Sequence, residues 1–148
     1  CSKPVIRRKA CALAFKLVIM SSDDDAVEEL VRYTADRLND SEKSVQLAAV
    51  GAIAEISRVN PKLFLVALPR LFKMVDEARD NWTLLKLVDI LTLFAQVEQR
   101  LLPKLEPKFK QLLTNQQSKS LLLAVVKSTL ELFSADSPIH AQAMKTLV

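Results

Sequence analysis

Apolar residues recur at alternating spacings of three and four along almost the whole chain, which is the pattern of amphipathic helices. Seven helices are predicted, at about residues 5–20, 26–38, 42–59, 61–78, 82–97, 98–114 and 118–133. An eighth begins at Ser137-Pro138. Asp23 to Asp25 precede the second helix, and Asp80 and Asn81 precede the fifth, where polar side chains cap helix amino ends.

Three prolines fall inside the predicted helices, Pro69 in the fourth and Pro103 and Pro107 in the sixth. An interior proline costs about 3 kcal/mol because it removes a backbone hydrogen bond and clashes with the preceding turn. Each of these helices is therefore expected either to divide into two short helices or to bend on the convex side of a curved stack.

The first, third, fifth and seventh helices align with each other at intervals of 39, 39 and 38 residues. Four apolar positions at offsets 0, 4, 7 and 11 trace one stripe along each helix, and we call them the repeat row. The row comprises Ile6, Ala10, Leu13 and Leu17, then Val45, Ala49, Ala52 and Ile56, then Leu84, Val88, Leu91 and Ala95, and finally Leu122, Val126, Thr129 and Phe133. A two-helix repeat of 38–39 residues lies close to HEAT and armadillo arrays. The predicted fold is an all-α solenoid, an α-α superhelix of seven to eight helices.

The predicted array lacks polar capping repeats at both ends, and such repeats are what close a solenoid. Residues 1–148 are therefore expected to form a single solenoid segment that belongs to a longer array.

Composition excludes most enzyme classes. The chain has one glycine, Gly51, one histidine, His140, and two cysteines, Cys1 and Cys11. A phosphate-binding loop needs several glycines, and a zinc site or a catalytic triad needs more ligands or bases than these. We predict no enzyme activity, no catalytic residue, no metal site and no cofactor. The acidic stretch from Asp23 to Asp25 lacks the spacing of a calcium loop and is read as a solvated helix start.

The net charge of +4 is concentrated in two basic clusters that carry the only candidate binding residues. One cluster is Arg7, Arg8 and Lys9, and the other is Arg100, Lys104 and Lys108, which share a helix face by four-residue spacing. Each is either a solvated face or a site for an acidic partner or an anionic membrane surface. Only 5% of residues are aromatic, which disfavours nucleic-acid binding through base stacking.

Three other residues are given packing roles. Cys11 lies in an apolar stretch and is expected to be a small buried hydrophobe. Trp82 is expected to lay its ring over the next repeat, and Gly51 to allow close packing between repeats.

Several motifs resemble the large-subunit trunks of adaptins. Ile6-Arg7-Arg8-Lys9-Ala10 resembles their V-R-K-K-A, and Val45-Gln46-Leu47-Ala48-Ala49-Val50 followed by Asn60-Pro61 resembles their V-Q-x-A-A-V and closing N-P. Asn81-Trp82-Thr83-Leu84-Leu85-Lys86 is similar to N-W-x-L-x-K, and Leu105, Pro107 and Leu112 stand in an L-x-P segment. In order and spacing, the set is most similar to the delta type of large subunit.

The resemblance implies a structural segment of a vesicle-coat adaptor that sorts proteins between Golgi or endosomes and the lysosome or vacuole. It implies beta, mu and sigma subunits as partners, with an Arf-type GTPase and dileucine cargo reached through the complex. It also implies a cytoplasmic protein that is peripheral on Golgi or endosomal membranes. The alternative is a HEAT-repeat scaffold or peptide-binding module of another system, of the nuclear-transport or regulatory-subunit type.

Overall fold

The computed structural model describes residues 3–115 and 118–148, and these fold into helices without a strand. Two compact units comprise Cys1–Glu77 and Ala78–Val148. The all-α solenoid class predicted from the repeat is confirmed by the helices. In each unit the first helices of two successive repeats pack against each other, α1 on α3 in the first unit and α5 on α7 in the second.

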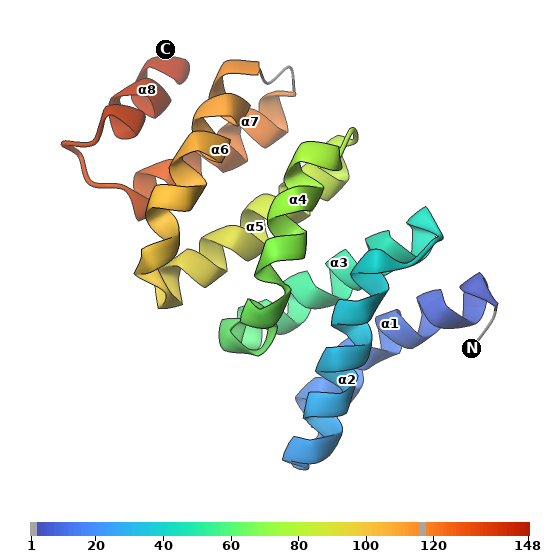
Figure 1. Cartoon of the computed structure of the whole chain (residues 1–148). Coiled ribbons are helices and arrows are strands. Elements are labelled where there is room, and N and C mark those ends of the chain that lie inside the picture. The colour runs from blue at the N-terminus through green and yellow to red at the C-terminus, as the bar shows by residue number, and fades with distance from the viewer. Residues whose placement is uncertain (1–2, 116–117) are drawn as a thin grey trace. The chain divides into compact units, whose positions relative to one another are not determined.

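In the first unit, α1 packs along α3 and also against α2, while the turn η1 packs on both α2 and α3 (Figure 1). The segment η2 packs on α3 and leads into α4. The bounds are α1 Pro4–Met20, α2 Asp24–Asp36, η1 Arg37–Asn39, α3 Lys43–Val59, η2 Pro61–Ala67 and α4 Leu68–Glu77.

In the second unit, α5 packs along α7, and α6, α7 and α8 pack against one another. The bounds are α5 Asn81–Val97, η3 Gln99–Leu101, α6 Leu102–Asn115, α7 Lys119–Leu132 and α8 Pro138–Thr146. The core of this unit contains Phe94, Leu105 and Phe109, each no more than 1% exposed.

Side-chain caps fix several helix starts where the sequence predicts them. The carboxylate of Asp23 accepts hydrogen bonds from the backbone amides of Asp25 and Ala26 at the start of α2. The carboxylate of Asp80 accepts the amide of Thr83 at 2.9 Å and the hydroxyl of the same residue at 2.6 Å. Each cap satisfies amides that have no partner within the first turn of the helix.

The prolines act in two ways. The predicted fourth and sixth helices each begin as a 3₁₀ helix and continue as an α-helix, so Pro69 and Pro103 are the second residues of α4 and α6. The expectation of two shorter helices is therefore correct at these two positions, where a missing amide costs little. Pro107 lies inside α6.

The repeat row is buried in α3, where Val45, Ala49, Ala52 and Ile56 are at most 6% exposed. The row of α5 is also buried, and that of α7 is buried or half-buried. In α1, by contrast, Ile6, Leu13 and Leu17 are each about half exposed. Gly51 lies within α3, and no glycine of the described residues has a positive φ.

Trp82 does not lie buried against another repeat as expected. It is the second residue of α5 and remains 47% exposed. The ammonium nitrogen of Lys86, one turn later, lies 5.9 Å from the centre of the ring. The indole therefore takes part in an exposed cation–π contact.

Replacing Trp82 with alanine is expected to lower the free energy of unfolding by about 1 kcal/mol or less, because an exposed cation–π pair contributes about 0.5–1 kcal/mol. Urea denaturation of the wild type and W82A measures the difference. A loss of several kcal/mol would show that the ring is buried in solution.

Candidate functional site

A buried polar cluster of the first unit joins α1 to the segment before α3. The guanidinium of Arg7 donates two hydrogen bonds to the carboxylate of Asp40, from Nε to Oδ2 at 2.7 Å and from Nη2 to Oδ1 at 2.8 Å. Both residues are buried, and 33 positions separate them in the sequence. A paired, bidentate contact of this kind is the strong form of an ion pair.

Asp40 receives further donors that fix its position. Its carboxylate accepts the amide of Glu42 at 3.0 Å and the guanidinium of Arg37 at 3.3 Å, and its carbonyl oxygen accepts the side-chain amide of Gln46 at 2.6 Å. Hydrogen bonding from Arg7 and from the backbone of Glu42 lowers the pKa of the Asp40 carboxyl to about 2, against the opposing effect of burial. The carboxylate is thus held ionised.

The first basic cluster does not form one surface. Arg8 and Lys9 are exposed, but Arg7 is only 9% exposed and its guanidinium forms an ion pair with the carboxylate of Asp40. The assignment of Arg7 to a partner-facing patch is corrected on this ground. The spacing of Arg7, Cys11 and Ala14, which places them on one buried face of α1, is the signal that could have found this role.

The second basic cluster is divided between two elements. Arg100 lies exposed in η3, whereas Lys104 and Lys108 lie in α6, exposed and half-buried respectively. Only these two lysines share an α-helix at four-residue spacing. The neighbouring Lys110 pairs with Glu106 at 2.7 Å.

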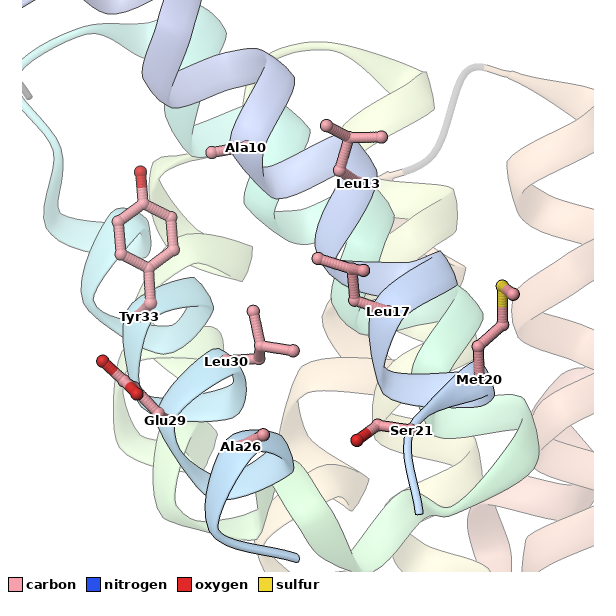
Figure 2. A pocket seen from close by; sticks show the side chains of 9 residues that line it. All are labelled: Ala10, Leu13, Leu17, Met20, Ser21, Ala26, Glu29, Leu30 and Tyr33. Carbon is pink, nitrogen blue, oxygen red and sulfur yellow. The ribbon is translucent and has the colours of Figure 1, made fainter. Parts of the chain in front are cut away.

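An apolar groove of about 680 Å³ lies between α1 and α2. Figure 2 shows the side chains of Leu17 and Leu30 directed toward each other across it, from α1 and α2 respectively. The lining residues are Ala10, Leu13, Leu17, Met20, Ser21, Ala26, Glu29, Leu30 and Tyr33. Three of the four residues of the repeat row of α1 thus lie along this groove.

Cys11 and Asp23 both have structural roles. Cys11 is fully buried, as expected, and burial raises the pKa of its thiol to about 11. Asp23 caps α2, and residues 3–115 and 118–148 contain no group of three or more His, Cys, Asp or Glu side chains placed to hold a metal ion.

Within residues 3–115 and 118–148, no helix combines the length and apolar character that a transmembrane span requires.

Comparison with known proteins identifies relatives over the whole chain. The adaptin N terminal region family matches residues 1–148. The AP-3 complex subunit delta-1 of Bos taurus is 28% identical over 99% of this chain, and the AP-3 complex subunit delta of Schizosaccharomyces pombe is 30% identical over 86%. The delta subunit of Saccharomyces cerevisiae is 31% identical over 82%. No solved structure matches the chain.

These relatives are much longer proteins. The chain spans about 12 to 15% of their length. The family match covers every residue, and it agrees with the motifs and with the two-helix repeat seen in both units. The resemblance to adaptin trunks is confirmed, and the chain belongs to the adaptin N terminal region family.

Proposed function

We propose that this chain is a scaffold segment of a delta-type large subunit in a vesicle-coat adaptor complex that sorts proteins within the cell. The observation that carries the proposal is the match of the whole chain to the adaptin family, together with relatives that are delta subunits of AP-3 complexes. The segment acts by holding other proteins in place, without catalysis.

The partners proposed for the complete subunit are the beta, mu and sigma types of adaptor subunit. An Arf-type GTPase and dileucine cargo are proposed to bind through the assembled complex. The proposed location is the cytoplasmic face of Golgi or endosomal membranes, where the protein is peripheral. A stack of two-helix repeats supports this role because it offers extended surfaces for other proteins.

The exposed cations are proposed to face an acidic partner or an anionic membrane. They are Arg8 and Lys9 on α1, Arg100 in η3 and Lys104 on α6, and the half-buried Lys108 lies one turn after Lys104. Charge reversal of Lys104 in the complete subunit is expected to reduce sedimentation with vesicles that contain phosphatidylserine, or else binding to an adaptor subunit. The matched control reverses Lys62, an exposed lysine outside both clusters.

Reconstitution tests the adaptor role. The complete polypeptide that contains this chain is purified with a sigma-type subunit and, separately, with an Arf-type GTPase loaded with GTP or GDP. Co-purification with the sigma subunit and GTP-dependent binding of the assembled complex are the expected results. If the sigma subunit and the GTP-loaded Arf both fail to bind, the adaptor role is wrong, and a scaffold of another system becomes the better assignment.

A further inference from the structure

We draw no further inference here: the strongest candidate, the apolar groove between α1 and α2, carries none because nothing in the structure shows what covers it.

Discussion

Replacing Phe109 with alanine is expected to lower the free energy of unfolding of the second unit by about 3–5 kcal/mol. Phe109 of α6 is 1% exposed, and its ring meets that of Phe133, at the end of α7, edge to face with centroids 6.4 Å apart. Truncation removes a large buried side chain between these helices and leaves a cavity that the surrounding side chains and backbone can only partly fill.

The measurement is urea denaturation followed by circular dichroism, with amide hydrogen exchange to locate the loss. Protection should fall in α6, α7 and α8, which pack against one another. Phe133→Leu is the comparison variant, because Phe133 is only half-buried and leucine retains most of its contact. A loss below about 1 kcal/mol for F109A would contradict the packing described for this unit.

Replacing Asp40 with asparagine is expected to lower the melting temperature at pH 7 by about 5–10 °C. The substitution leaves the guanidinium of Arg7 buried without its carboxylate. Asparagine keeps a side-chain oxygen that can still accept the amide of Glu42, so the variant tests the charge and not the turn. The double variant Arg7→Met with Asp40→Asn should recover much of the loss, since it removes the isolated charge.

The same pair gives a pH dependence with a defined sign. The folded protein holds the pKa of Asp40 at about 2, below the value of about 3.9 in an unfolded chain. The unfolded state therefore binds more protons in this interval, and stability falls as the pH falls. The contribution of Asp40 is complete above about pH 4 and is lost between about pH 4 and pH 2.

Thermal unfolding of the wild type and of D40N between pH 6 and pH 2 measures this contribution. Other carboxylates titrate in both proteins, so the difference between the two isolates Asp40. The difference should be constant above pH 4 and shrink below it. A difference that stays constant down to pH 2 would contradict the ion pair.

Helix positions could be predicted because they depend on nearby residues. The three-and-four spacing and the side chains of Asp23 and Asp80 gave the starts of α2 and α5 within two residues. The 3₁₀ helices η2 and η3 were harder to predict from the sequence. They form where the chain turns between packed helices. The prolines indicate only that the helix is interrupted nearby, and they do not give the type of helix that precedes the interruption.

Candidate contacts could be predicted less well. The cluster of Arg7, Arg8 and Lys9 looks uniform in the sequence, yet one of its members is buried and two are exposed. The sequence shows which face of α1 Arg7 shares with Cys11, but the partner Asp40 lies 33 positions away. Trp82 was misjudged for the same reason, since its exposure depends on what surrounds the start of α5.

By itself, the sequence determined the helical class, the 38–39-residue repeat and the adaptin resemblance, because periodicity and caps are local properties of the chain. The tertiary structure alone decided which apolar rows are covered and which charges are paired. Those outcomes depend on distant segments that meet only after folding. The row of α3 and the row of α1 read alike in the sequence, and only packing distinguishes a buried seam from an open groove.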